Sequence, residues 1–326
     1  MDKILLVSLD NLGDIVFASA LAAPIKRRFP DAELCVWCKA YAADAARLIP
    51  EAARVFAADP FWDVSPGTSK GSLRAFVKSL LQIRRERFSL AVLASDSTKA
   101  AAALRFAGIP MRVGFGRRFG RLFLTHPVPA AEASKPALEE LSRLLGPLGI
   151  GPTPLVCRLD AEPLAERRAK LAAVVGDGRL AVIHPFAGDA ARCAPLSEWG
   201  RFAQGLRSKG FSPLWIGTGP ELKSLRERLG EPEGHWWLDR QGDGTLADAA
   251  AAISLAAVFA GHDSGPLHLA AAFAVPCLGV FSPGEPRRTF PQGRGPWRLV
   301  SRPAPRDVSA GEMLRELESL LESVRA

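Results

Sequence analysis

Short apolar runs alternate with amphipathic segments along most of this chain. Residues 3–9 form an apolar run without alternation, which is typical of a strand buried on both faces of a parallel sheet. From Ile15 to Phe29 the apolar residues recur at spacings of three and four, which predicts a helix that ends in cations before Pro30. The chain therefore opens with a strand followed by a helix.

The same pair of elements recurs after Pro30. Further strands are predicted at 33–38, 53–57 and 90–94, and further helices at 42–49, 71–85 and 98–107. The pattern weakens between 108 and 163, where one helix is predicted at 136–145 and where we expect the hinge. Such alternation predicts an α/β fold whose parallel strands are joined by right-handed crossovers.

The alternation resumes in the second half of the chain. The predicted elements are strands at 180–184, 212–216, 236–238, 257–260 and 277–281, and helices at 197–208, 220–229, 245–253, 266–272 and 311–323. We therefore expect two Rossmann-like parallel-sheet domains facing each other across a cleft, at residues 1–157 and 158–326. The final helix is a candidate to pack back on the N-terminal domain.

The net positive charge is concentrated in one segment. The chain has 42 Lys and Arg against 34 Asp and Glu, and the segment from Arg74 to Arg121 alone holds eleven basic and two acidic residues. This segment is either a solvated helix face with a basic loop or a surface for a phosphorylated or membrane-borne substrate. Nucleic acid is a weaker alternative, because no helix-turn-helix, zinc-finger or RNA-binding motif accompanies the charge.

The cysteines and the apolar stretches indicate a reducing, cytoplasmic location. Five cysteines do not form the even set of a disulfide framework. Cys35 and Cys38 form a C-x-x-C, but within a predicted strand, whereas a redox pair needs its first thiol at a helix N-terminus. The N-terminus lacks the apolar region of a signal peptide, and the longest apolar stretches are too short to span a membrane.

Candidate chemistry lies in the loops that follow the predicted strands, where helix N-termini offer unpaired N–H groups. Asp14 lies in the first turn of the first helix, and it is either a helix cap or a functional acid. The loop from Gly261 to His268 combines two glycines, an acid, a hydroxyl and a histidine before a helix that starts with Pro266. A capping motif does not require that combination, so we expect this loop to bind an anion.

Several common enzyme motifs are absent from the sequence. No G-x-G-x-x-G follows the first strand, and neither a P-loop nor a G-x-S-x-G elbow occurs. Dehydrogenase, P-loop NTPase and α/β-hydrolase functions therefore lose support. There is also no D-x-D, so nothing signals a diphosphate bridged by a metal ion.

The sequence resembles glycosyltransferase family 9, the lipopolysaccharide heptosyltransferases. The resemblance rests on the opening strand followed by Leu12-Gly13-Asp14, on the stretch 261–272 (GHDSGPLHLAAA), on Pro276 and on 281–283 (FSP). It implies a GT-B fold, with the acceptor on the N-terminal domain and an ADP-heptose type of donor on the C-terminal domain. It also implies inversion at the anomeric carbon, with no cofactor and no obligatory metal ion.

The resemblance assigns roles to individual residues. Asp14 matches the catalytic base, and the acceptor side would include Asn11, Gly13 and Lys99. The donor side would comprise Arg192, Thr218, Glu221, Asp263, Ser264, Gly265 and His268. Residues 184–195 depart from the family pattern, because Arg192 stands where the family often has a lysine that reaches the diphosphate.

The resemblance therefore predicts an inverting, metal-independent transferase that moves a heptose-type sugar from an ADP-sugar to the lipopolysaccharide core. Its partners would be a nucleotide sugar, a phosphorylated or anionic glycolipid and an anionic membrane surface at the inner face of the plasma membrane, with no nucleic acid. Three alternatives stay open: a sibling transferase that uses another nucleotide sugar or glycan, a non-catalytic nucleotide-sugar-binding protein, and an epimerase on the same fold.

Overall fold

A computed structural model of the chain describes residues 2–63, 71–129, 132, 134–176, 178–240, 244–282 and 286–325. The chain forms two compact units, at residues 1–159 and 160–326, so the boundary falls two residues after the expected one. Within the described residues, no helix combines the length and the apolar character needed to cross a membrane.

The first unit is built on a six-stranded parallel sheet with the order β3-β2-β1-β4-β5-β6. Its strands are β1 (Lys3–Ser8), β2 (Glu33–Cys38), β3 (Arg54–Ala57), β4 (Leu90–Leu93), β5 (Met111–Phe115) and β6 (His126–Val128). The central β1 pairs with β2 and β4, placing Leu5 opposite both Cys35 and Ala91. All three of these side chains are fully buried, as expected for a strand covered on both faces.

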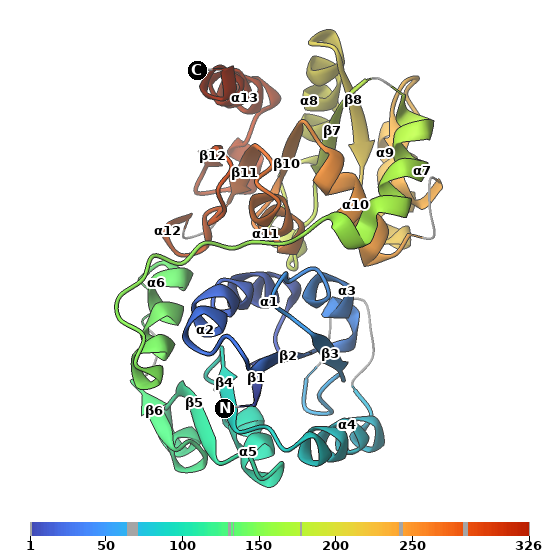
Figure 1. The fold of residues 1–326 in the computed structure, drawn as a ribbon. Coiled ribbons are helices and arrows are strands. Elements are labelled where there is room, and N and C mark those ends of the chain that lie inside the picture. Colours follow the sequence, from blue (N-terminus) through green and yellow to red (C-terminus); the bar gives the residue numbers. More distant parts are fainter. Residues whose placement is uncertain are drawn as a thin grey trace. The chain divides into compact units, whose positions relative to one another are not determined.

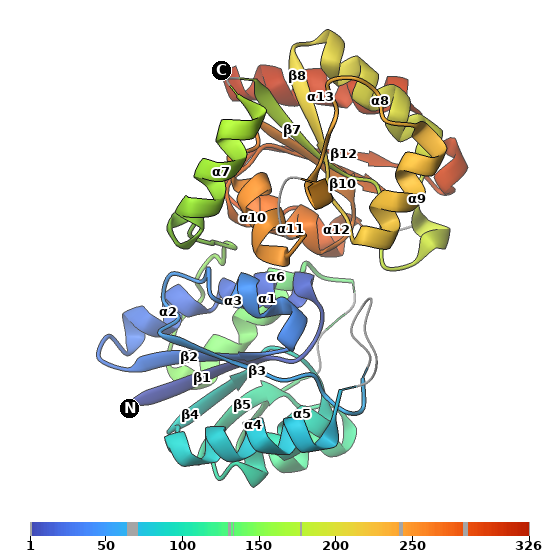
Figure 2. The same ribbon diagram turned by 90° about the vertical axis from the view of Figure 1, so that its right-hand side faces the viewer.

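Helices cover both faces of this sheet (Figures 1 and 2). One face carries α1 (Leu12–Ser19), α2 (Ala22–Arg28), α3 (Ala43–Ala46) and α6 (Ala137–Ser142), and the other carries α4 (Leu73–Glu86) and α5 (Thr98–Phe106). Short 3-10 turns complete the unit: η1 (Ala40–Ala42), η2 (Arg118–Phe123) and η3 (Arg143–Leu148). The core under α4 and α5 includes Phe76, Ile83 and Leu104.

Two sequence predictions for this unit differ from the structure. The helix expected from Ile15 to Phe29 is broken into α1 and α2, because Pro24 has no N–H to bond the carbonyl of Ala20. The boundary between the units falls inside the segment 108–163, where the hinge was expected, but most of that segment forms β5, β6 and α6 of the first unit.

The strand β5 was not predicted from the sequence because it contains Arg112. Its side chain interrupts the apolar run, yet it is buried, and its guanidinium donates to the carbonyls of Ile109 and Phe123. Because these hydrogen bonds satisfy the guanidinium N–H groups, a buried cation is compatible with a strand. Arg112 therefore holds the structure together and does not belong to the exposed basic surface that the sequence suggested.

The second unit repeats the same topology. Its sheet has the order β12-β11-β10-β7-β8-β9, with β7 (Arg179–His184), β8 (Phe211–Trp215), β9 (Trp236–Trp237), β10 (Val258–His262), β11 (Cys277–Phe281) and β12 (Trp297–Ser301). Counted from the first strand of each unit, this is the order of the first sheet. The sheet's edge strand β12 was not predicted, because Arg298 and Ser301 break its apolar pattern.

The helices of the second unit also lie on both faces of its sheet (Figure 2). They are α7 (Ala165–Val175), α8 (Leu196–Ser208), α9 (Gly219–Leu229), α10 (Leu246–Leu255), α11 (Gly265–Ala272), α12 (Pro286–Thr289) and α13 (Ala310–Arg325), with 3-10 turns η4 (Glu162–Leu164), η5 (Ala190–Arg192), η6 (Leu238–Arg240) and η7 (Pro305–Asp307). The final helix packs on its own unit, since Met313, Leu317 and Leu320 lie in the same core as Trp199 of α8.

The two thiols of the C-x-x-C lie on β2, as the sequence predicted. Burial raises the pKa of Cys35 to about 11 and that of Cys38 to about 12. Both groups therefore remain uncharged thiols at neutral pH, and a neutral thiol is a poor nucleophile and a poor metal ligand.

Candidate functional site

Each sheet has one point at which the strand order reverses direction. These switch points lie between β1 and β4 in the first unit and between β7 and β10 in the second. Open α/β sheets bind ligands beyond the carboxyl ends of their strands at such points. The residues singled out from the sequence follow these four strands, apart from Thr218 and Glu221, which follow the neighbouring β8.

At the first switch point, the loop after β1 leads into a capped helix. Asn11 is the N-cap of α1, and Asp14 occupies the third helical position, where its carboxylate accepts the Asn11 N–H at 2.9 Å. Asp14 is exposed, and Gly13 is half-buried beside it. The structure thus shows that Asp14 does cap the helix, while its exposed position keeps the carboxylate within reach of a substrate.

A buried lysine and a tyrosine support this loop from the end of β2. The Lys39 side chain is 1% exposed, and its Nζ lies 2.7 Å from an Asp63 carboxylate oxygen and 3.4 Å from Asn11 Oδ1. The Tyr41 hydroxyl accepts the Leu12 N–H at 2.7 Å. These contacts fix the start of α1, and the sequence analysis did not identify either residue.

Asp10 adds a second carboxyl group to the same loop. Burial, followed by the negative charge of Asp14, raises the pKa of the Asp10 carboxyl to about 6. The raised value means that this acid exchanges its proton near neutral pH, as catalytic acids and bases do.

Lys99 comes from the other strand of this switch point. It lies in the first turn of α5, which follows β4, and its ammonium group stacks 5.8 Å from the centre of the Trp62 ring. Lys99 is exposed. It presents a positive charge at the carboxyl end of the sheet, in keeping with a contact to an anionic substrate.

At the second switch point, a cluster of donors surrounds Asp263, which follows β10. Arg192, from η5 after β7, donates from its guanidinium to Asp263 Oδ2 at 2.8 Å. The Thr289 hydroxyl donates to the same oxygen at 3.1 Å, and His268 Nε2 lies 3.5 Å from Oδ1. Burial alone would raise the pKa of the Asp263 carboxyl, but its contacts with His268 and Arg192 hold that pKa below its usual value.

The N-terminus of α11 lies next to this cluster. Ser264 is its N-cap and Gly265 its first residue, yet the Ser264 side chain makes no capping hydrogen bond to the first turn. The Ser264 hydroxyl instead lies 3.1 Å from the His262 carbonyl and 3.2 Å from His184 Nδ1. A helix N-terminus without a side-chain cap attracts anions through its N–H groups and its dipole.

Two buried histidines, His184 and His262, lie at the ends of β7 and β10, next to the second switch point. Burial lowers the pKa of both His184 and His262 to about 4, so both rings are neutral at physiological pH. His262 Nε2 accepts the Ala194 N–H at 3.0 Å and the Trp199 indole N–H at 3.3 Å. These bonds tie the end of the loop after β7 to β10, which keeps Arg192 close to Asp263.

Thr218 and Glu221 lie one strand away, at the start of α9. The Glu221 carboxylate accepts both the Thr218 N–H, at 2.7 Å, and the Thr218 hydroxyl, at 2.8 Å. A Cβ at Gly217 would lie 3.0 Å from the Phe186 ring, so the absence of a side chain at Gly217 helps the loops after β7 and β8 to approach this closely. Glu221 is therefore a helix cap at the border of the second switch point.

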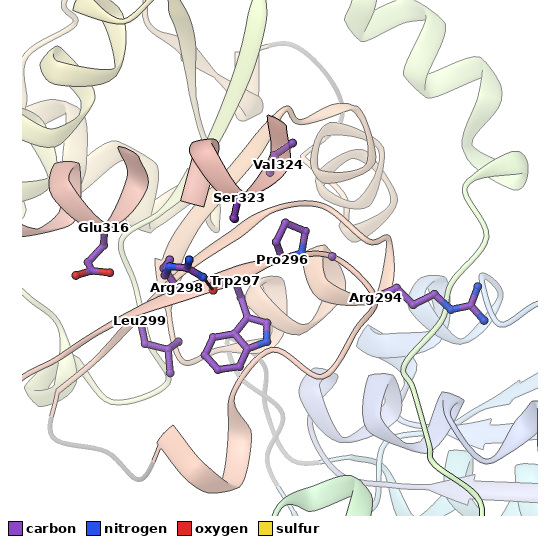
Figure 3. A pocket seen from close by; sticks show the side chains of 9 residues that line it. Arg294, Pro296, Trp297, Arg298, Leu299, Glu316, Ser323 and Val324 are labelled. Carbon is purple, nitrogen blue, oxygen red and sulfur yellow. Dashed lines mark hydrogen bonds between the residues drawn. The ribbon is translucent and has the colours of Figure 1, made fainter. Parts of the chain in front are cut away.

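A cavity of about 800 Å³ in the second unit lies elsewhere (Figure 3). It is lined by residues 294–299 and by Glu316, Ser323 and Val324 of α13. Because residues 294–296 precede β12, this cavity is at the amino end of the sheet, opposite to the loops described above. None of the predicted site residues lines it. Among the described residues, no cluster of three or more His, Cys, Asp or Glu side chains could hold a metal ion.

Most of these groups could be identified from the sequence, but some of their partners could not. Thr289 and Lys39 stand outside any motif, and only the folded chain brings them to Asp263 and Asn11. His184 could have been identified from the sequence, since it ends a predicted buried strand directly before a loop. Pro283, which contributed to the family resemblance, lies outside the described residues.

Comparison with known proteins gives a consistent result. The model of glycosyltransferase family 9 (heptosyltransferase) matches residues 74–300. The chain is also 24% identical to lipopolysaccharide heptosyltransferase 2 of Salmonella typhimurium over 307 residues, covering 89% of this chain and 85% of that protein.

Solved structures share the fold over nearly the whole chain. A family 9 glycosyltransferase from Veillonella parvula superposes with a TM-score of 0.83 at 14% identity, covering 99% of this chain and 97% of that one. The E. coli ADP-heptose lipopolysaccharide heptosyltransferase II gives a TM-score of 0.79 at 19% identity, covering 99% and 100%. Both units thus have the Rossmann-like form of a GT-B enzyme, and the match to the family model establishes that this chain belongs to glycosyltransferase family 9, the heptosyltransferases.

Proposed function

We propose that this glycosyltransferase moves a heptose-type sugar from an ADP-sugar to a phosphorylated lipopolysaccharide core acceptor, with inversion and without a metal ion. The names of its relatives support the donor: one E. coli heptosyltransferase of similar fold, with a TM-score of 0.78, was solved with ADP-2-deoxy-2-fluoro heptose. The observation that carries the proposal is the Arg192 and Asp263 pair beside the uncapped start of α11.

The donor diphosphate would bind at the second switch point. Arg192 is one third exposed, so its planar guanidinium can bond phosphate oxygens while one nitrogen stays on Asp263. The N–H groups at Ser264 and Gly265 add partial positive charge. Charge of this kind stabilises the leaving diphosphate in the role that a metal ion would otherwise fill. Asp263 and His268 would act by holding Arg192 in place.

The nucleoside would extend toward the start of α9. Glu221 and Thr218 lie there, after β8, the strand next to β7, and a carboxylate is a suitable acceptor for ribose hydroxyl groups. The Phe186 ring, which lies close to Gly217, offers an apolar surface for a base.

The acceptor would bind at the first switch point. Asp14 would take the proton of the acceptor hydroxyl as that oxygen attacks the anomeric carbon, and the bond from this carbon to the diphosphate oxygen would break, releasing ADP. A single displacement of this kind inverts the anomeric centre. Asn11 and Gly13 would shape the loop, and Lys99 would bind a phosphate of the core, at the inner face of the plasma membrane.

A panel of nucleotide diphosphates and nucleotide sugars tests the donor. We expect ADP and ADP-heptose to raise the melting temperature and UDP or GDP compounds to leave it unchanged, because a specific ligand stabilises by RT ln(1 + [L]/Kd). Stabilisation by a different nucleotide would make the chain a sibling transferase. Stabilisation by ADP-heptose without any transfer to a core acceptor would favour a non-catalytic binding protein.

A further inference from the structure

The outer surface of the first unit combines exposed apolar side chains with exposed cations. Six large apolar residues in α4, α5 and η2 are between 40% and 74% exposed: Leu73, Val77, Leu81, Phe106, Phe119 and Leu122. We name this surface the α4–η2 face. A monomer rarely leaves so many large apolar side chains exposed together, and such groups usually mark a binding surface.

The apolar residues of α4 form one continuous stripe. Leu73, Val77 and Leu81 are four residues apart, so they lie above one another on one flank of the helix. The inward flank of the same helix is already filled by Phe76 and Ile83, which are buried in the core. The exposed stripe is therefore not needed to hold α4 on the sheet.

Contacts within the unit connect this stripe to the rest of the face. The Arg84 guanidinium, one turn after Leu81, donates to the Phe106 carbonyl at the end of α5 with a length of 3.2 Å. η2 packs on the start of α5, where a Cβ at Gly120 would lie 3.1 Å from the Thr98 hydroxyl oxygen. Figures 1 and 2 show α4 and α5 together on one face of the first sheet.

Cations border the apolar side chains. Arg74, Lys78 and Arg85 lie on the outward flank of α4, beyond the stripe, and all three are exposed. Arg105 and Arg121 are exposed on α5 and η2. Arg117 adds less positive charge to this face, since its guanidinium lies 3.5 Å from the Asp96 carboxylate. A helix with apolar residues on one side and cations beside them has the composition of a segment that lies flat on an anionic membrane surface.

We infer that the α4–η2 face docks this enzyme on an anionic phospholipid bilayer. The apolar stripe and the phenylalanines of α5 and η2 enter the headgroup region, and the neighbouring cations bind lipid phosphates. This inference rests on the membrane-bound acceptor of the proposed function, and it assigns the contact to side chains that take no part in the candidate site. Charge favours a bilayer over a second copy of this chain, because two such faces would repel each other.

Vesicle sedimentation tests the inference with two matched pairs of variants. The first triple variant is Leu73→Ser, Val77→Ser, Leu81→Ser, and its control removes three exposed valines elsewhere: Val156→Ser, Val174→Ser, Val324→Ser. The second is Arg74→Gln, Lys78→Gln, Arg85→Gln, and its control is Lys223→Gln, Arg228→Gln, Arg306→Gln. Both charge variants lower the net charge of +8 by three, so only the location of the charge differs.

We expect wild type and both controls to bind phosphatidylcholine vesicles that contain phosphatidylglycerol, and to bind pure phosphatidylcholine weakly. Both face variants should bind the anionic vesicles at least tenfold more weakly, and added salt should weaken wild-type binding steeply. Face variants that bind as wild type, or controls that lose as much, would overturn the inference. A wild-type dimer that the serine variant dissociates would overturn it in favour of a second copy.

Failure of the proposed function is distinguishable from failure of this inference. The face variants should transfer sugar to a deacylated acceptor in solution at the wild-type rate, since they leave both switch points intact. An enzyme that binds anionic vesicles through this face but transfers no sugar would refute the proposed function alone. Wild-type transfer without vesicle binding would refute the inference alone.

Discussion

The two switch points have the same topology but different electrostatics. At the first, Asp10 and Asp14 share one loop, and their mutual repulsion contributes to the raised pKa of Asp10. At the second, the only acid of the loop after β10 is Asp263, which is held ionised by Arg192 and His268. The same strand order thus supports a loop that can accept a proton and a loop that holds cations ready for an anion.

This difference suits the two halves of a glycosyl transfer. Deprotonating an acceptor requires a carboxylate that is not already saturated by cations, whereas releasing a diphosphate requires cations that are fixed in place. The comparison therefore predicts that substitutions at the first switch point change turnover, and that substitutions at the second change the affinity for the donor.

The largest effect is expected for Asp14→Asn. Removing a general base typically lowers turnover by a factor of about 10² to 10⁴, and donor affinity should stay within about twofold of wild type. Initial rates at saturating donor, together with calorimetry of ADP binding, measure the two quantities.

A matched control separates catalysis from helix capping. Asp248 holds the same third helical position in α10, where its carboxylate accepts the Thr245 N–H at 3.1 Å. Asp248→Asn should lower stability and leave turnover unchanged. An Asp14→Asn enzyme with near wild-type turnover would reduce Asp14 to a cap, and Asp10 would become the candidate base.

Arg192→Ala tests the second switch point. Loss of a charge-assisted bond to the diphosphate should weaken ADP binding by about 1.5–3 kcal/mol, and Arg192→Lys should recover part of it because lysine keeps the charge without the planar fork. Calorimetry with ADP measures the change, and Arg201→Ala, which removes an exposed partner of Glu198 on α8, serves as the control. Unchanged affinity in Arg192→Ala would move the diphosphate away from this loop.

Asp10→Asn tests the electrostatic part of the comparison. The folded pKa of about 6 exceeds the ordinary value of 3.8, so the protonated form is favoured in the fold, and its stabilisation is lost as the pH rises through 6. The variant should therefore be more stable than wild type at pH 8, by about 1–3 kcal/mol, with the difference shrinking toward pH 4. Urea unfolding at several pH values measures it.

Asp31→Asn, which makes the same substitution in the exposed turn before β2, is the control for this experiment. A pH-independent difference between Asp10→Asn and wild type would mean that Asp10 is not a titrating member of the first switch point. The two loops would then differ less than their side chains suggest.

Most buried central strands of both sheets, and the edge strands β3 and β9, could be predicted from the sequence, whereas the edge strands β6 and β12 could not. β1, β4, β7 and β10 are short apolar runs, and the burial of their side chains on both sheet faces produces that pattern directly. β6 and β12 are edge strands with one partner strand each. Polar residues can occur in such partly exposed strands, so the continuous apolar pattern disappears. α7 was missed for a related reason, since Leu171 is the one residue of this helix that is buried.

The candidate site could be predicted as a set of loops but not as a set of contacts. Asp263 and His268 are close in sequence, and their proximity follows from the start of one helix. The bond from Arg192 to Asp263 joins residues 71 positions apart, and only the pairing of β7 with β10 brings them together. Long-range pairing of this kind leaves no local signal in the sequence.

The smallest effect is expected for Glu221→Ala, which asks whether the second switch point extends to the start of α9. Glu221 caps this helix through Thr218, so its loss should cost about 0.5–2 kcal/mol of stability whatever the ligand does. If the carboxylate also binds the ribose, ADP affinity should fall about three- to tenfold, while the affinity for inorganic pyrophosphate should not change. Thr218→Ala disrupts the same cap and keeps the carboxylate, so it should lower stability with a smaller loss of ADP affinity. Equal losses in the two variants would show that Glu221 acts on the nucleotide only by holding α9 in place, and would confine the donor contacts to the loops after β7 and β10.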